Sequence, residues 1–195
     1  MYSGIDSKWL AMTPVLSESY TEYVTRLVRN LHLIKLGKGA NATVFQHPRD
    51  PTVAVKVFST YDKYFQEYIK WVRKNQRNVF APKLKGKATV YMRKNSPGIG
   101  ILFMERLTPV TKEDERKWTQ YFASFIHHRY PGDSYVRFGS LMNKGDLEEL
   151  ATNPEVPKDV KDIFKFLRQH EPRLDPSSAN FMLRGDQLVF TDPLA

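Results

Sequence analysis

The chain of 195 residues contains no cysteine, which excludes disulfide bonds, thiolate metal sites and a cysteine nucleophile. Long apolar runs are also missing, because charged residues interrupt every apolar stretch, so we expect no membrane span. Residues 1–10 lack the apolar stretch of a signal peptide. These absences favour a cytoplasmic protein, and the length of 195 residues favours one domain or two small lobes.

The composition predicts a folded protein with an excess of positive charge. Hydrophobic residues make up 41% and aromatic residues 13%, which is enough for a real core. The net charge of +9 is compatible with nucleic acid as a partner, but no nucleic-acid-binding motif is recognisable. The basic residues are spread through the chain, so an acidic partner, nucleotide phosphates or simple solvation would suit them equally well.

The stretch 174–194, LDPSSANFMLRGDQLVFTDPL, predicts a loop, a two-stranded hairpin and a final acidic turn. The apolar runs FML and LVF are expected to pair across the turn RGDQ. This pairing would bring Asp192 back beside Asn180, which follows Asp175 by five residues. Two carboxylates and one amide then face a small volume. Such oxygens suit Mg²⁺, and one carboxylate is left to handle a hydroxyl proton.

The run VAVKVF at 53–58 predicts an apolar strand with one charge, Lys56. Burying this lysine alone would cost roughly several kcal/mol, so we expect an anion beside it unless the strand lies at an edge and the side chain reaches water. Glu67, on a helix expected over 61–75, is the candidate partner, with Asp62 as a competitor. The apolar face of this helix comprises Phe65, Tyr68, Ile69 and Val72.

Residues 31–45, LHLIKLGKGANATVF, predict a strand, a glycine-bearing turn and a second strand. Gly37 and Gly39 would let the backbone approach a phosphate closely, although many such glycine pairs form ordinary turns. Other expected elements are strands over 87–93 and 99–104, a helix capped by Ser17, a helix over 111–129 capped by Thr111, and helices over 146–151 and 157–170. His127 and His128 are adjacent on the expected helix and lack ligands at metal-binding spacing, so we expect no metal there.

Taken in order, these motifs resemble the protein-kinase-like superfamily, and most closely the short serine/threonine kinases of T7-like phages. The resemblance covers residues 31–195 and implies an α+β, minimal bilobal protein-kinase-like fold, with an antiparallel β-sheet N-lobe and a reduced, mostly helical C-lobe. It implies an N-terminal arm and helix at 1–30, an N-lobe at 31–107 and a truncated C-lobe at 108–195. The motifs are Gly37-x-Gly39, Lys56, a helix glutamate, the Met104–Leu107 hinge, Asp175-x-x-Ser178-x-Asn180 and Thr191-Asp192-Pro193.

The resemblance implies transfer of the ATP γ-phosphoryl group to serine or threonine hydroxyls of proteins, in a phage-encoded enzyme acting on host proteins. It implies that Asp175 positions and deprotonates the acceptor, while Asn180 and Asp192 hold Mg²⁺. Lys56 would hold the α- and β-phosphates. The adenine ring would lie under Val44 and meet backbone groups of the hinge at Glu105 and Leu107.

The sequence departs from the kinase pattern in ways that leave alternatives open. Ala42 replaces the third glycine, and Arg173-Leu174 stand where His-Arg usually precedes the catalytic aspartate. No activation segment follows Asp192, so we expect no control by activation-loop phosphorylation, and peptide docking would use other surfaces such as 130–153. A kinase-like protein that acts by binding is one alternative. A small-molecule phosphotransferase is another, although Ser177 stands where such enzymes usually carry histidine.

Overall fold

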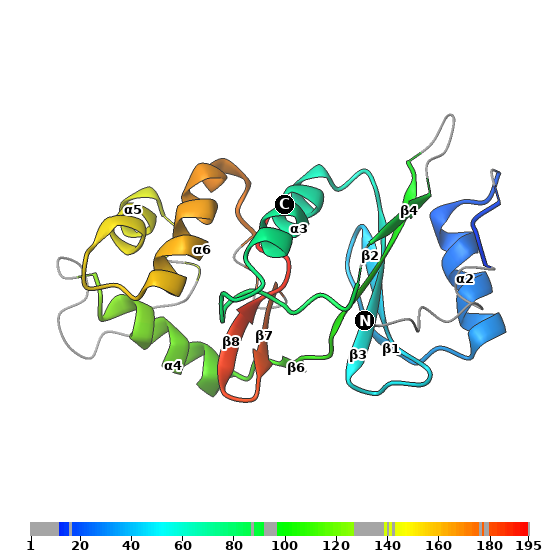
Figure 1. The fold of residues 1–195 in the computed structure, drawn as a ribbon, viewed down its shortest axis with the longest axis horizontal. Coiled ribbons are helices and arrows are strands. Elements are labelled where there is room, and N and C mark those ends of the chain that lie inside the picture. Colours follow the sequence, from blue (N-terminus) through cyan, green and yellow to red (C-terminus); the bar gives the residue numbers. More distant parts are fainter. Residues whose placement is uncertain are drawn as a thin grey trace. The chain divides into compact units, whose positions relative to one another are not determined.

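The computed structural model describes residues 12–15, 17–86, 88–91, 97–126, 139, 141, 143–175, 177 and 180–194. The chain divides into two compact units, whose elements are labelled in Figure 1. The first unit draws on residues 1–63 and 83–106, and the second on residues 64–82 and 107–195. An antiparallel sheet forms the first unit and helices dominate the second, which confirms the predicted α+β class. Within the described ranges, no helix is long and apolar enough to cross a membrane.

The first unit is built on a five-stranded antiparallel sheet. The strand order is β1 (Lys35–Lys38), β2 (Ala42–Gln46), β3 (Val53–Ser59), β5 (Ile99–Glu105) and β4 (Thr89–Tyr91). The central strand β3 pairs with β5 along its whole length, from Val53 opposite Glu105 to Ser59 opposite Ile99. The predicted strands in 31–45, 53–58 and 99–104 are confirmed. The strand expected over 87–93 is seen as β4, and residues 87 and 92–96 lie outside the described residues.

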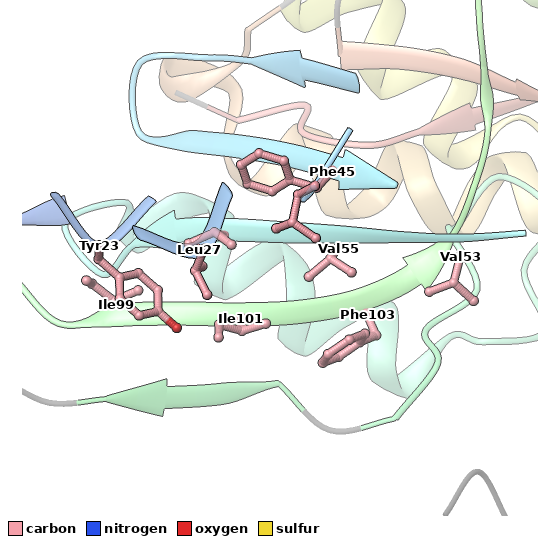
Figure 2. Close-up of a cluster of buried hydrophobic side chains, with 10 residues drawn as sticks. Tyr23, Leu27, Phe45, Val53, Val55, Ile99, Ile101 and Phe103 are labelled. Carbon is pink, nitrogen blue, oxygen red and sulfur yellow. The ribbon is translucent and has the colours of Figure 1, made fainter. Parts of the chain in front are cut away.

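Helix α2 (Tyr20–Leu31) packs on one face of this sheet, and Figure 2 shows its Tyr23 and Leu27 among strand residues of the buried cluster. Its Tyr23 and Leu27 are completely buried against strand residues of that face. Because side chains alternate along a strand, the strand residues that lie between members of this cluster, such as Lys56 between Val55 and Val57, point to the opposite face of the sheet. The buried cluster comprises Tyr23, Leu27, Leu33, Phe45, Val53, Val55, Val57, Ile99, Ile101 and Phe103.

The start of α2 differs from the prediction by two residues. Ser19, not Ser17, is the N-cap: its hydroxyl accepts the N–H of Glu22, and the Glu22 carboxylate accepts the N–H of Ser19 at 2.6 Å. Glu18 pairs instead with Arg26 at 2.7 Å. This reciprocal capping box sets the first turn, which the single-residue N-cap rule missed.

The second unit combines helices with a small sheet. Its helices are α3 (Lys63–Lys74, whose first residue is counted with the first unit), α4 (Lys112–Ala123), α5 (Lys144–Thr152) and α6 (Lys158–Gln169), with a 3-10 turn η2 (Glu171–Arg173). The sheet has the order β6 (Thr108–Pro109), β7 (Phe181–Arg184) and β8 (Gln187–Phe190). Phe122 of α4 is buried among aromatic rings, with its ring centroid 5.2 Å from Phe164 and 5.7 Å from Phe80.

Helix α3 clusters with this second unit, whereas the sequence reading grouped 31–107 together. Its predicted inward face is confirmed, because Phe65, Tyr68, Ile69 and Val72 are all buried. The inward face predicted for 157–170 is also confirmed by the buried side chains of α6. Those side chains are Val160, Ile163, Phe164 and Leu167.

Helix α4 begins as predicted and ends earlier than predicted. Thr111 is its N-cap, in a capping box with Asp114. The helix ends at Ala123 rather than Arg129, because the N–H groups of Phe125 and Ile126 bond three residues back and tighten the chain into turns. His127 and His128 lie outside the described residues, as does most of 130–145. The short helix expected over 146–151 is α5, which begins at Lys144 because Asn143 caps it.

Candidate functional site

The hairpin predicted near the C-terminus is present and sets the geometry of the acidic loops. β7 and β8 pair from Phe181 opposite Phe190 to Arg184 opposite Gln187. Gly185 takes a φ of 58° in the turn, a conformation that favours glycine. At the open end, the N–H of Thr191 donates to the carbonyl of Asn180 at 2.8 Å. The hairpin therefore carries Asn180 and the segment of Asp192 side by side.

A second pair of contacts brings Asp175 to the same place. Leu174 and Leu194 form an isolated antiparallel bridge. The N–H of Asp175 donates to the carbonyl of Pro193 at 3.0 Å. Asp192 thus lies between Thr191 and Pro193, and the main chain of each is hydrogen-bonded to one end of the Asp175–Asn180 loop. Of that loop, Pro176, Ser178 and Ala179 lie outside the described residues.

The side chain of Asn180 bonds back to the start of its own loop. Its Nδ2 donates to the carbonyl of Asp175 at 3.2 Å, which assigns the amide orientation because a carbonyl requires a donor. Its Oδ1 is therefore oriented as the acceptor atom of the side chain, and its role as a cation ligand stays a prediction. Asp175 accepts the N–H of Ser177 on Oδ1 at 3.1 Å. Asp175, Asn180 and Asp192 are all half-buried.

Tyr68 of α3 supports the Asp192 loop, a role that sequence reasoning missed. The buried hydroxyl donates to the main-chain carbonyl of Phe190, two residues before Asp192. Burial, and then the nearby Asp192 carboxylate, raise the pKa of Tyr68 well above its usual value. The phenol is therefore a neutral donor at physiological pH. The sequence signal was a hydroxyl on an otherwise apolar helix face, which pattern analysis counted only as core.

Lys56 lies in the first unit, on the sheet face opposite α2. Its direct neighbours in the sheet are Val44 on β2 and Leu102 on β5. The side chain is 7% exposed, although it stands in the middle of an apolar face. Ala54 and Met104 face each other two residues further along. This arrangement confirms a buried strand lysine, which excludes the alternative of an edge-strand lysine pointing to water.

Gly37 and Gly39 lie in and just after β1, opposite the start of β2. The N–H of Gly39 donates to the carbonyl of Ala42 at 2.9 Å, which closes the turn. A Cβ atom built on either glycine would meet nothing within 4 Å, and neither residue has a positive φ. The fold of the described chain therefore does not itself require glycine at these two positions. A phosphate contact at Gly37 and Gly39 stays a prediction.

The expected hinge lies at the end of β5, and some of its main-chain N–H groups already donate hydrogen bonds within the protein. The N–H of Glu105 donates to Lys83, and that of Arg106 donates to Thr52 at 2.7 Å. The Glu105 carboxylate accepts the N–H of Lys83 at 2.7 Å. Leu107 is buried, at 7% exposure, where the chain passes into the second unit. The N–H groups of Glu105 and Arg106 thus already have acceptors within the protein. Adenine recognition at Glu105 and Leu107 stays a prediction.

Glu67 lies on α3 with its carboxylate near a histidine. Its Oε2 is 3.2 Å from Nε2 of His170, at the end of α6. The other ring nitrogen of His170, Nδ1, is 2.9 Å from the carbonyl of Phe166. Glu67 and Lys56 belong to different units, so their pairing stays a prediction, as does the competing role of Asp62.

The donor set of the hairpin loops fits a hard cation held jointly with phosphates. Asn180 and Asp192 offer an amide oxygen and a carboxylate, and Mg²⁺ usually binds one or two protein oxygens together with substrate phosphates. Among the described residues, no group of three or more His, Cys, Asp or Glu side chains is placed to hold a metal alone. If the cation were present, it would neutralise phosphate charge at these two residues.

Comparison with known proteins leaves the family unassigned. No family model matches the chain, and no curated protein sequence does. A protein from Haemophilus somnus 129PT described as a fructosamine-3-kinase has a similar structure, with 15% identity and a TM-score of 0.37, over 84% of this chain and 65% of that chain. The chain thus spans less than two thirds of that protein. APH(2")-IIa, solved as a ternary complex with streptomycin and ATP, matches at 13% identity and a TM-score of 0.31, over 91% of this chain and 70% of its own.

Proposed function

We propose that the protein is an ATP-dependent phosphotransferase whose chemistry depends on Asp175, Asn180 and Asp192. One observation carries the proposal: main-chain hydrogen bonds and the Leu174–Leu194 bridge hold the segments of these three residues side by side at the open end of one hairpin. Their side chains supply oxygen donors of the kind that a Mg²⁺-nucleotide needs.

Each residue has a distinct role in this proposal. Asp175 keeps Oδ1 on the Ser177 N–H, and its other oxygen accepts the proton of the acceptor hydroxyl. Asn180 contributes Oδ1 and Asp192 its carboxylate to the cation. Lys56 holds the non-transferred phosphates against the apolar sheet face. Positioning and charge neutralisation supply most of the rate enhancement in phosphoryl transfer.

We further propose that the acceptor is a serine or threonine hydroxyl of a protein, in a phage-encoded enzyme acting on host proteins. The motif order Gly37-x-Gly39, Lys56, Asp175 and Asp192 supports a protein kinase. The net charge of +9 disfavours a polycationic small-molecule acceptor such as an aminoglycoside.

The test is incubation of the purified protein with Mg²⁺-ATP, with and without a generic basic protein, followed by intact-mass measurement of both. We expect phosphate on the basic protein or on the chain itself. The Asp175→Asn variant should still gain thermal stability from ATP and lose transfer by about 10³-fold or more. If Asp175→Asn transfers phosphate at the wild-type rate, Asp175 is not the catalytic base. If millimolar ATP does not raise the melting temperature of the wild-type protein, there is no nucleotide site.

A further inference from the structure

One face of helix α3 carries a row of cations. Lys63, Lys70 and Lys74 are spaced seven and four residues apart, which places them on one line along the helix, and Arg73 lies beside it. All four side chains are exposed. They lie opposite the buried face of the helix, so the fold does not use them. We call these four residues the α3 cationic face.

Among the described residues, some basic side chains on other helices are paired with acids, whereas those of the α3 cationic face are not. Within the described residues, none of the four forms an ion pair. The only acid in α3 is Glu67, which lies on the same line between Lys63 and Lys70. Its Oε2 is 3.2 Å from Nε2 of His170. By contrast, three basic residues of other helices each lie within 2.7 Å of an acid. These pairs are Arg26 with Glu18, Lys158 with Asp162, and Arg168 with Glu148.

The surroundings of the face point to the kind of anion that it binds. None of the exposed large hydrophobic residues found in the described chain belongs to α3 itself, and Tyr61, two residues before it, is the one exposed aromatic beside the face. A protein interface needs an apolar or aromatic centre, and an unpaired nucleic-acid strand needs several aromatic side chains on which successive bases stack. A helix that lies on a membrane needs an exposed apolar side. The sugar-phosphate backbone of a duplex needs none of these.

We infer that the α3 cationic face binds the phosphate backbone of a nucleic-acid duplex without reading its sequence. From Lys63 to Lys74 the helix rises about 16 Å, and duplex DNA carries one charge per about 1.7 Å of its axis. Several phosphates therefore lie within reach of this row. The net charge of +9 steers the duplex toward the protein over longer distances. The inference does not depend on phosphoryl transfer and needs no nucleotide.

The experiment measures fluorescence anisotropy of a labelled 20-base-pair DNA duplex of mixed sequence with the full chain, at several salt concentrations and without ATP. We expect binding whose logarithm falls linearly with the logarithm of salt concentration. The triple variant Lys70→Gln, Arg73→Gln, Lys74→Gln should bind more weakly. Its salt slope should be smaller by about 2.7, because each lost phosphate contact removes about 0.9.

A matched variant of α4 tests whether binding depends on the α3 cationic face or only on the total positive charge of the protein. The substitutions Lys112→Gln, Arg116→Gln and Lys117→Gln also remove three exposed charges, but they do so beside three acidic residues of the same helix. We expect this variant to keep nearly the full wild-type slope. Equal losses in the two variants would overturn the inference, as would absence of duplex binding at low salt. Binding of a labelled polyglutamate chain or of anionic vesicles as tight as that of the duplex would also overturn it.

Discussion

The two units hold their candidate residues by different means. In the first unit, Lys56 sits inside a regular strand, and its position follows from the pairing of β3 with β2 and β5. In the second, Asp175 and Asp192 sit in irregular backbone that is fixed by individual hydrogen bonds between distant segments. A strand residue is held by many equivalent bonds, whereas a loop residue depends on a few. The second group should therefore be more sensitive to single changes in its surroundings.

The largest expected effect tests whether the two groups act on one nucleotide. Lys56→Met and Asp192→Ala should each lower the rate of phosphoryl transfer by about 10³-fold, because each removes charge that stabilises the transition state. If both act on the same phosphates, the double variant should be little worse than either single variant. Single-turnover kinetics with saturating Mg²⁺-ATP measures this. Fully additive losses would show that the two residues act independently.

A second prediction compares two glycines of the same sheet. A Cβ at Gly100 would lie 2.1 Å from Cζ of the buried Phe58 ring, so Gly100→Ala should destabilise the protein by about 1–3 kcal/mol. A Cβ at Gly39 would meet nothing within 4 Å, so Gly39→Ala should leave the unfolding free energy nearly unchanged. Urea denaturation measures both changes.

The same glycine variants sharpen the interpretation of the nucleotide site. If the backbone at Gly39 approaches a phosphate, Gly39→Ala should reduce the stabilisation that ATP gives, while the protein without ATP melts as the wild type does. An unchanged response to ATP would make Gly39 an ordinary turn residue.

A third prediction compares two buried tyrosines, one from each unit. The hydroxyl of Tyr68 donates to the carbonyl of Phe190, so Tyr68→Phe removes this buried hydrogen bond at a cost of about 0.5–1.5 kcal/mol. The Tyr23 hydroxyl is buried and makes no hydrogen bond within the described structure, so Tyr23→Phe should be neutral or slightly stabilising. Thermal melting compares the two variants.

The tyrosine pair also tests the link to Asp192. Tyr68→Phe should raise the Mg²⁺ concentration needed for half-maximal transfer and leave the rate at saturating Mg²⁺ nearly unchanged, because the loop remains present but is held less firmly. Tyr23→Phe should change neither quantity. A lower saturating rate with an unchanged Mg²⁺ requirement would assign Tyr68 a purely structural role.

The regular elements could be predicted from the sequence because their signals are local. A short apolar run containing one charge identified the strand of Lys56, and a period of 3.6 identified the buried face of α3. The turn residues RGDQ located the hairpin. Each of these depends on neighbours within a few residues.

The remaining features depend on contacts between distant segments. The bond from Tyr68 to Phe190 spans 122 residues, and no local pattern encodes it. The end of α4 and the contact between Glu67 and His170 were likewise missed, because tertiary packing and hydrogen bonding determine them. The association of α3 with the second unit follows from the same kind of contact.

The smallest expected effect concerns a helix cap in the second unit and depends on pH. Hydrogen bonds from the Thr111 hydroxyl, and then from its N–H, lower the pKa of Asp114 below its usual value. The folded state therefore favours the charged carboxylate, and this stabilisation is complete above the ordinary aspartate pKa of about 3.9. It is lost as the pH falls through the lower pKa of the folded state. The melting temperature of Asp114→Asn should thus lie slightly below that of the wild type near neutral pH and converge with it in acid. A constant difference at every pH would show that the charge of Asp114 contributes nothing to the cap.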